Sequence, residues 1–149
     1  MPEVLTAVID STVLVSAFLT EGGVSAELLR FAREGVFLVF LSEDILAETQ
    51  HTLAYPRIRE RYNYTDDDVT DFLNRLRLAA DIVTELPQVT VVTRDPNDDM
   101  IIATAARAQA AYLVTRDNDL LSLQQYEDIT IISPETFIAI VRERGRLNP

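Results

Sequence analysis

Short apolar runs recur along the chain and predict strands. They cover residues 4–9, 36–41, 112–115 and 129–132, with two further β-prone pieces at 81–86 and 89–93 on either side of Pro87. An apolar run of about four to eight residues is typical of a strand buried on both faces of a parallel sheet. We therefore expect a sheet whose strands are separated by other elements.

Apolar residues at helical spacing occupy the segments between these runs. We expect a helical region at about 13–34, interrupted by Gly22-Gly23, and helices at about 43–53, 66–80, 96–110 and 134–144. Ser42, Thr65, Asp95 and Ser133 precede helices as good N-caps. Strands that alternate with helices imply a parallel sheet covered on both faces. We predict one three-layer α/β/α domain over residues 1–149, because no linker, repeat or low-complexity segment divides the chain.

No segment has the character of a membrane span or a signal peptide. The longest uninterrupted apolar run, Val36–Leu41, is far shorter than the roughly 20 residues that cross a bilayer. The N-terminus carries Glu3 and Asp10 and has no basic region ahead of an apolar one. We therefore expect a cytoplasmic protein without a membrane partner.

The composition excludes several kinds of chemistry. The chain has no cysteine and no lysine, since all 13 basic residues are arginine. Disulfides, thiol nucleophiles, a Walker P-loop and a Schiff base are thereby excluded. The four glycines form no dinucleotide fingerprint. His51, the single histidine, is expected at a helix surface and argues against a histidine-rich metal site or a Ser-His-Asp triad.

The formal net charge of −11 results from 24 acidic residues and 13 arginines. Such a charge argues against the capture of nucleic acid by a basic surface. It favours basic partners or bound divalent cations instead. The positions of the acids along the chain distinguish between basic partners and divalent cations.

Three acids directly follow predicted strands. Asp10 ends the strand at 4–9, while Asp117 and Asp119 follow the strand at 112–115. In an open parallel sheet, ligands bind beyond the carboxyl ends of the strands, where the strand order reverses. We therefore expect these acids at one rim of the sheet if the two strands are neighbours.

Two further acids are predicted to face inward from helices. Asp99 has isoleucine or alanine three, four and seven positions later, so we expect it on the buried face, with Asp98 as a surface acid of the first turn. Glu48 shares a helix face with Ile45, and Asp44, one turn earlier, is a possible substitute for it. Helix acids of this kind are in isolation more often simply solvated.

Carboxylates that converge without lysine or histidine repel one another, and burial adds several kcal/mol to the cost of each charge. Hard divalent cations such as Mg²⁺ or Mn²⁺ bind oxygen ligands and neutralise such a group. A carboxylate site with two such ions is suited to phosphodiester hydrolysis. Substrate phosphates would then meet metal cations rather than the acidic surface.

Four motifs occur in an order and spacing that match a known family. They are the strand ending in Asp10-Ser-Thr-Val-Leu-Val-Ser-Ala, then Ser42-x-x-Ile-x-x-Glu48, then Asp95-Pro-Asn-Asp-Asp99-Met-Ile-Ile-Ala-Thr-Ala, then Leu113-Val-Thr-Arg-Asp117-Asn-Asp119-Leu-Leu. With these motifs the chain resembles a PIN domain over about residues 4–140. It is most similar to the VapC-like toxins of bacterial and archaeal toxin–antitoxin systems.

The resemblance implies a Mg²⁺- or Mn²⁺-dependent ribonuclease with the strand order 3-2-1-4-5. The implied metal-binding and catalytic residues are Asp10, Glu48, Asp99 and Asp117. Asp119 matches an additional acid, and Thr12 and Thr115 match positions whose hydroxyls support the acids.

The chain departs from the family pattern in two places. Thr12 stands where the family has asparagine, and both Asp117 and Asp119 are eligible as the fourth acid. The resemblance also implies a small antitoxin that inserts a basic residue among the acids, and a homodimer. RNA would be the substrate.

Arginines supply the candidate phosphate contacts. Arg94 and Arg116 lie close to the acidic rim in sequence. A second group combines Arg57, Arg59 and Arg61 with Tyr55, Tyr62 and Tyr64. This group either grips RNA by phosphate contacts and base stacking or forms local ion pairs.

Two other functions remain open at this stage. The acidic face is also compatible with a non-catalytic module that docks a basic protein. A Toprim-like phosphotransfer enzyme would use Asp117 and Asp119 as its acidic pair, but its usual glutamate-to-glycine signature at a strand end is missing.

Overall fold

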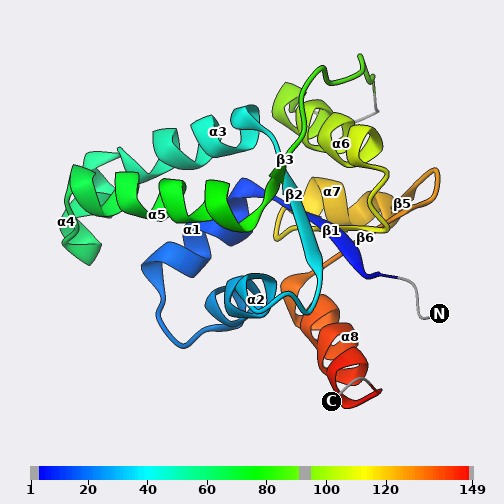
Figure 1. The fold of residues 1–149 in the computed structure, drawn as a ribbon. Helices are drawn as coiled ribbons and strands as arrows, with labels where there is room; N and C mark the ends of the chain where they lie inside the picture. The colour runs from blue at the N-terminus through cyan, green and yellow to red at the C-terminus, as the bar shows by residue number, and fades with distance from the viewer. Residues whose placement is uncertain (1–3, 91–94, 148–149) are drawn as a thin grey trace.

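The computed structural model describes residues 4–90 and 95–147. The strands of this part of the chain form one sheet in the order β3-β2-β1-β4-β6-β5 (Figure 1). Their bounds are β1 Thr6–Ile9, β2 Leu38–Leu41, β3 Asp81–Ile82, β4 Tyr112–Val114, β5 Gln125–Tyr126 and β6 Ile129–Ile132. All neighbouring strands are parallel except β5 and β6, which pair in antiparallel fashion.

The predicted strand order is confirmed, with β6 as the fifth predicted strand. The two residues of β5 extend the sheet beyond that prediction, because the chain turns back onto β6. The β-prone piece at 81–86 forms a strand only at its first two residues. The piece at 89–93 shows no strand at 89–90, and the rest of it lies outside the described residues.

The helices alternate with the strands as expected. They are α1 Ser11–Leu19, α2 Val24–Arg33, α3 Glu43–Leu53, α4 Pro56–Tyr62, α5 Asp66–Ala79, α6 Pro96–Ala108, α7 Asn118–Leu123 and α8 Pro134–Leu147. The sequence pattern did not predict α4 or α7. The short helix α4 buries none of its residues and α7 buries only Leu120, so neither has an apolar face to detect.

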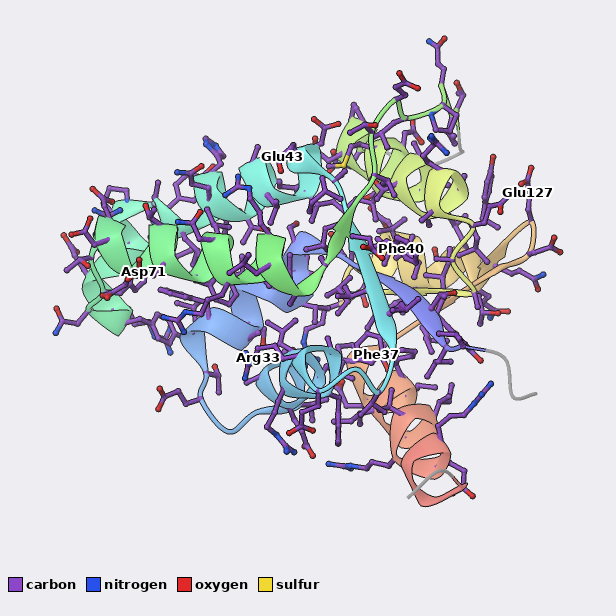
Figure 2. The ribbon with its side chains drawn as sticks, in the orientation of Figure 1. Arg33, Phe37, Phe40, Glu43, Asp71 and Glu127 are labelled. Atoms are coloured by element: carbon purple, nitrogen blue, oxygen red, sulfur yellow. The ribbon has the colours of Figure 1, made fainter. Side chains whose placement is uncertain are left out.

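Helices cover both faces of the sheet. Figure 1 shows α1, α2, α3 and α5 on one side and α6 and α7 on the other, which confirms the three-layer α/β/α prediction. Phe37, just ahead of β2, packs edge-to-face against Phe137 of α8 with ring centroids 5.0 Å apart. Charged side chains such as Asp71 and Glu127 lie at the outside of the molecule (Figure 2).

No single helix in the described ranges is long and apolar enough to cross a membrane. Only α1 and α2 taken together reach such a length, and they are bent by 101° where they meet.

The topology places the ends of β1 and β4 side by side. Ile9 is paired with Val114, and the backbone N–H of Asp10 donates to the carbonyl of Val114 at 3.0 Å. The segments that follow these two strands therefore share one rim of the sheet, as parallel neighbours must. Asp10 and Asp117 both lie in those segments.

Ser42 connects the start of α3 to α6 across this rim. Its buried Oγ accepts a hydrogen bond from the backbone N–H of Ile45 at 3.2 Å, which caps α3. The same oxygen accepts from the Thr104 hydroxyl of α6 at 3.0 Å. One side chain thus begins α3 and fixes it against α6.

We expect Ser42→Ala to destabilise the protein by about 2 kcal/mol, because the variant loses both the N-cap and the link to Thr104. The measurement is urea unfolding followed by circular dichroism. Ser133→Ala is the matched control, since the Ser133 hydroxyl accepts from the backbone N–H of Thr136 at the start of α8. The control is expected to lose about 1 kcal/mol, and equal losses in the two variants would contradict the connecting role of Ser42.

Candidate functional site

Asp10 is the buried centre of an acidic cluster at this rim. Its side chain is 2% exposed. The Thr115 hydroxyl donates to Oδ2 at 2.6 Å, and the Thr12 hydroxyl donates to the same oxygen at 2.9 Å. Burial raises the pKa of Asp10, while the hydrogen bonds from Thr115, Thr12 and Ser11 favour the ionised form and offset part of that rise.

The two threonines also hold the loop that follows β4. The backbone N–H of Arg116 donates to Thr12 Oγ1 at 3.1 Å. The backbone N–H of Asp117 donates to Thr115 Oγ1 at 2.9 Å. Each threonine hydroxyl therefore connects the backbone of residues 115–117 to the carboxylate of Asp10 by hydrogen bonds. The structure places Thr12 and Thr115 where the sequence analysis expected hydroxyls that support an acid.

Ser11 bridges two carboxylates. Its Oγ lies 3.2 Å from Oδ1 of Asp10 and 3.0 Å from Oε1 of Glu48. A hydroxyl has one proton to donate, so it satisfies only one of these oxygens at a time. Ser11 was not among the predicted site residues, because a serine directly after an aspartate at the end of a strand is typical of an ordinary helix start.

Glu48 reaches this rim from α3. Its Oε2 is buried and accepts no hydrogen bond from any described residue. Burial raises the pKa of Glu48, and the negative charges of Asp10, Asp95 and Asp117 raise it further. Asp44, the possible substitute, is exposed one turn earlier.

Asp98, not Asp99, is the buried acid of α6. Asp98 is 3% exposed and its Oδ2 has no hydrogen-bond partner among the described residues, whereas Asp99 is half-buried. The prediction that placed Asp99 inward and Asp98 at the surface was therefore wrong. Residues 101–105 are all buried, so the helix has no sharp polar face. Ile101 and Ile102 follow Asp98 at the same helical spacing that had suggested Asp99, and this register was the available signal.

Burial and a neighbouring carboxylate together perturb Asp98. Burial, followed by the interaction with Asp117, raises the pKa of Asp98 to about 7. The charges of Asp95 and Asp10 act in the same direction. The carboxyl of Asp98 therefore favours its protonated form more than an exposed aspartate does, unless a cation replaces the proton.

Asp117 and Asp119 complete the cluster at its outer side. Asp117 caps α7, and its Oδ1 accepts from the backbone N–H of Asp119 at 2.8 Å. Asp98, Asp117 and Asp119 each present a carboxylate oxygen, and these oxygens lie within 4.8 Å of one another. Asp117 is half-buried and Asp119 is exposed, so both acids stand beside Asp98.

Of the two arginines predicted to contact RNA phosphates, the structure describes Arg116. The guanidinium of Arg116 lies 2.6 Å from Oε1 of Glu135 and 3.4 Å from the Ser25 hydroxyl. Arg116 is therefore already ion-paired on the side of α8. Arg94 lies outside the described residues.

This donor set fits a hard divalent cation. Asp10, Glu48, Asp98 and Asp117 come from four segments and supply only oxygen ligands, which Mg²⁺ and Mn²⁺ prefer. Buried carboxylate oxygens without hydrogen-bond partners are costly. Among the described residues, Glu48 Oε2 and Asp98 Oδ2 are two such oxygens, and each is a position that a bound cation would satisfy.

The comparisons with known proteins agree with this geometry. The family model described as PIN domain matches residues 6–119. A search of curated proteins gave no significant match. Two solved structures share the fold at low sequence identity. The first is VapBC2 from Rickettsia felis bound to a DNA fragment from its promoter, with a TM-score of 0.60, 12% identity, and coverage of 87% of this chain and 98% of the other. The second is PAE2754 from Pyrobaculum aerophilum, with a TM-score of 0.55, 14% identity, and coverage of 93% and 90%.

The match extends over the acids of all four motifs on which the resemblance was based, from Asp10 to Asp119. Together with the parallel sheet and the acids gathered at its rim, it shows that this chain belongs to the PIN-domain family.

Proposed function

We propose that this protein is a Mg²⁺- or Mn²⁺-dependent endoribonuclease that hydrolyses RNA phosphodiester bonds. The observation that carries the proposal is the pair of buried carboxylate oxygens, Glu48 Oε2 and Asp98 Oδ2, which no described residue satisfies. They lie within a cluster of acids whose charges repel one another, and no arginine of residues 4–90 and 95–147 forms an ion pair with Asp10, Glu48, Asp98 or Asp117. Such a cluster is stable when a divalent cation neutralises it.

In this proposal Asp10, Glu48, Asp98 and Asp117 hold the cation, with Asp119 at the outer edge. Asp98 takes the role that the sequence analysis gave to Asp99. When bound, the cation supplies the positive charge that allows an RNA phosphate to approach the acids and that favours attack at phosphorus.

The chain itself orients the acids and handles protons. The hydroxyls of Thr12 and Thr115 fix Oδ2 of Asp10, and the Ser11 hydroxyl contacts Oδ1. Glu48 presents its unpaired Oε2 to the cation, while its Oε1 contacts the Ser11 hydroxyl at 3.0 Å. Asp98 holds a proton near neutrality and releases it when a cation binds.

The biological role we propose is that of the toxin in a toxin–antitoxin pair. The Rickettsia felis structure with a similar fold is a VapBC2 assembly. The net charge of −11 and the acidic rim suit a small antitoxin with a basic segment. A homodimer in the cytoplasm is part of the same proposal.

Cleavage of RNA with added Mn²⁺ tests the proposal and separates Asp98 from its neighbour. We expect Asp98→Asn to lower the cleavage rate at least about 100-fold, because it removes a charged ligand from the buried cluster. The matched control is Asp99→Asn, which makes the same chemical change at the next position and is expected to retain most of the activity. The assay is gel electrophoresis of an end-labelled single-stranded RNA over time.

Two results would overturn the proposal in different ways. If Asp98→Asn cleaves like the unaltered protein, the site assignment is wrong. If the unaltered protein neither cleaves RNA nor takes up Mn²⁺ in a calorimetric titration, the acidic rim is a docking surface for a basic protein.

The stability of the metal-free protein is expected to depend on Asp98 and pH. The carboxyl binds its proton more tightly in the folded protein, at a pKa of about 7, than in the unfolded chain, at about 3.9. Folding stability therefore falls as pH rises from about 4 to about 7 and stays low above that range. We expect Asp98→Asn to stabilise the metal-free protein by roughly 2–4 kcal/mol at pH 8 and by little at pH 4.

Chemical denaturation in EDTA at several pH values measures this effect. Saturating Mn²⁺ is expected to remove the advantage of the variant, because the cation stabilises the unaltered protein more strongly. A gain that is the same at pH 4 and pH 8 would show that Asp98 is not the titrating group.

Thr115 is expected to act on the cation through Asp10. Thr115→Val keeps the shape of the side chain but removes the 2.6 Å hydrogen bond to Oδ2, so we expect Mn²⁺ affinity to fall about 10- to 100-fold. Thr49→Val is the control, since the Thr49 hydroxyl is also fully buried but donates within α3 to the carbonyl of Ile45. Isothermal titration calorimetry compares the two variants, and equal affinities would refute this role for Thr115.

A further inference from the structure

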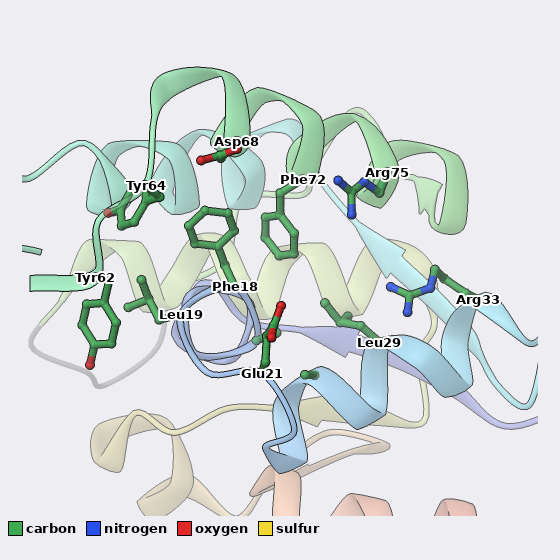
Figure 3. A pocket seen from close by; sticks show the side chains of 12 residues that line it. Phe18, Leu19, Glu21, Leu29, Arg33, Tyr62, Tyr64, Asp68, Phe72 and Arg75 are labelled. Atoms are coloured by element: carbon green, nitrogen blue, oxygen red, sulfur yellow. The ribbon is translucent and has the colours of Figure 1, made fainter. Parts of the chain in front are cut away.

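A second concave site lies away from the acidic rim. A cavity of about 420 Å³ opens between the end of α1, one side of α2 along its length and the α4–α5 segment (Figure 3). A volume in this range suits a ligand the size of a nucleotide. None of the acids of the candidate metal site lines this cavity.

Aromatic rings form the interior of this cavity. Phe18 is central, with the Tyr64 ring 4.9 Å away in an edge-to-face contact and the Phe72 ring 5.1 Å away. The Tyr64 hydroxyl donates to the carbonyl of Leu53 at 2.6 Å, which fixes that ring. Tyr62 stands at one end of the cavity and is 43% exposed (Figure 3). The cavity therefore offers rigid aromatic surface together with one accessible ring.

Two arginines face each other at the other end. Arg33 extends from α2 and Arg75 from α5, on opposite walls of the cavity (Figure 3). Neither guanidinium makes a hydrogen bond or an ion pair with any residue in the described ranges. By contrast, ion pairs with nearby acids engage Arg30, Arg59, Arg77, Arg116 and Arg142. On a chain with a net charge of −11, an unpaired arginine pair across a cavity indicates an anionic ligand.

The acids of the cavity narrow the choice of that ligand. The carboxylate of Asp68 accepts from the backbone N–H of Thr65 in the capping box of α5, and the Glu21 side chain points into the cavity without an ion pair to either arginine (Figure 3). A peptide with several acidic side chains would be repelled by Asp68 and Glu21. A nucleotide places one phosphate between the arginines and a neutral base against the rings, which suits both ends.

We propose that this cavity binds one nucleotide of a single-stranded RNA, with its phosphate between Arg33 and Arg75 and its base against Phe18, Phe72 and Tyr62. The inference rests on the proposed function, because it gives the RNA substrate a second point of attachment. Thr12 begins α1 beside the acids and Phe18 ends it at the cavity, roughly 9 Å apart along the helix axis. The cavity therefore affects how RNA is held and not the reaction at phosphorus.

Binding of a fluorescein-labelled ten-nucleotide oligouridylate, followed by anisotropy in EDTA, tests this proposal in the absence of cleavage. For Arg33→Ala/Arg75→Ala we expect binding at least about tenfold weaker at low salt. We also expect the slope of log affinity against log salt to be shallower by about 0.7, the value for one neutralised phosphate of a single strand. Tyr62→Ala is expected to weaken binding about fivefold or more, with no change in the salt slope.

The matched control is Arg30→Ala/Arg77→Ala. It removes the same charge from the same two helices, but both arginines are ion-paired to neighbouring acids. We expect its affinity and salt slope to remain close to those of the unaltered protein, and Arg33→Lys/Arg75→Lys is expected to retain the salt slope. If the two double alanine variants weaken binding equally, the effect is one of overall charge and the proposal fails.

Kinetics with Mn²⁺ separate this inference from the proposed function. We expect Arg33→Ala/Arg75→Ala to raise KM for a ten-nucleotide RNA and to leave kcat unchanged. Unchanged binding and KM in this variant, together with loss of cleavage in Asp98→Asn, would overturn the nucleotide site and leave the ribonuclease intact. Displacement of the oligonucleotide by equimolar uridine monophosphate would show a site for a free nucleotide, and tighter binding of an acidic aromatic peptide would show a protein partner. Either result overturns the assignment to an RNA strand.

Discussion

Mutual repulsion between carboxylates held out of water governs how this rim of the sheet is built. Asp10 and Asp98 are almost fully buried, and neither is paired with an arginine in the part of the chain that the structure describes. Hydroxyl groups offset part of this repulsion, because they donate hydrogen bonds to Asp10 without adding a charge. The remaining repulsion between the carboxylates is not offset. The Ser11 hydroxyl has one proton to donate to two acids, and the pKa of Asp98 is raised to about 7. A site of this kind is preorganised for a cation and costs stability without one.

Most strands and helices were predictable because each has a strong local signal, whereas the strand order followed from the family resemblance. Buried runs such as that ending at Ile9 identified the parallel strands, and good caps such as Ser42 and Asp95 marked where the helices begin. The helices α4 and α7 escaped detection because hydrogen bonding and local turns, rather than an apolar face, define them. Strand β5 forms because the chain turns back onto β6, and the pattern of apolar residues does not predict that turn.

The position of the acidic cluster was predictable to within one residue, while the roles of its acids stay a prediction. Asp10, Glu48, Asp117 and Asp119 lie where the strand ends and helix faces suggested. The choice between Asp98 and Asp99 failed because α6 is buried through five consecutive residues, so small alanines gave two neighbouring registers equal support. The bridging position of Ser11 depends on the distance between α1 and α3 in space, which the sequence does not specify.

The two outermost strands of the sheet, β3 and β5, have only two residues each. A long open strand at such a border would offer its unpaired amides and carbonyls to another copy of the protein and so promote aggregation. Two-residue borders give a second sheet very little to pair with. Self-association through continuous sheets is thereby disfavoured, and contact between copies is left to the helical surfaces.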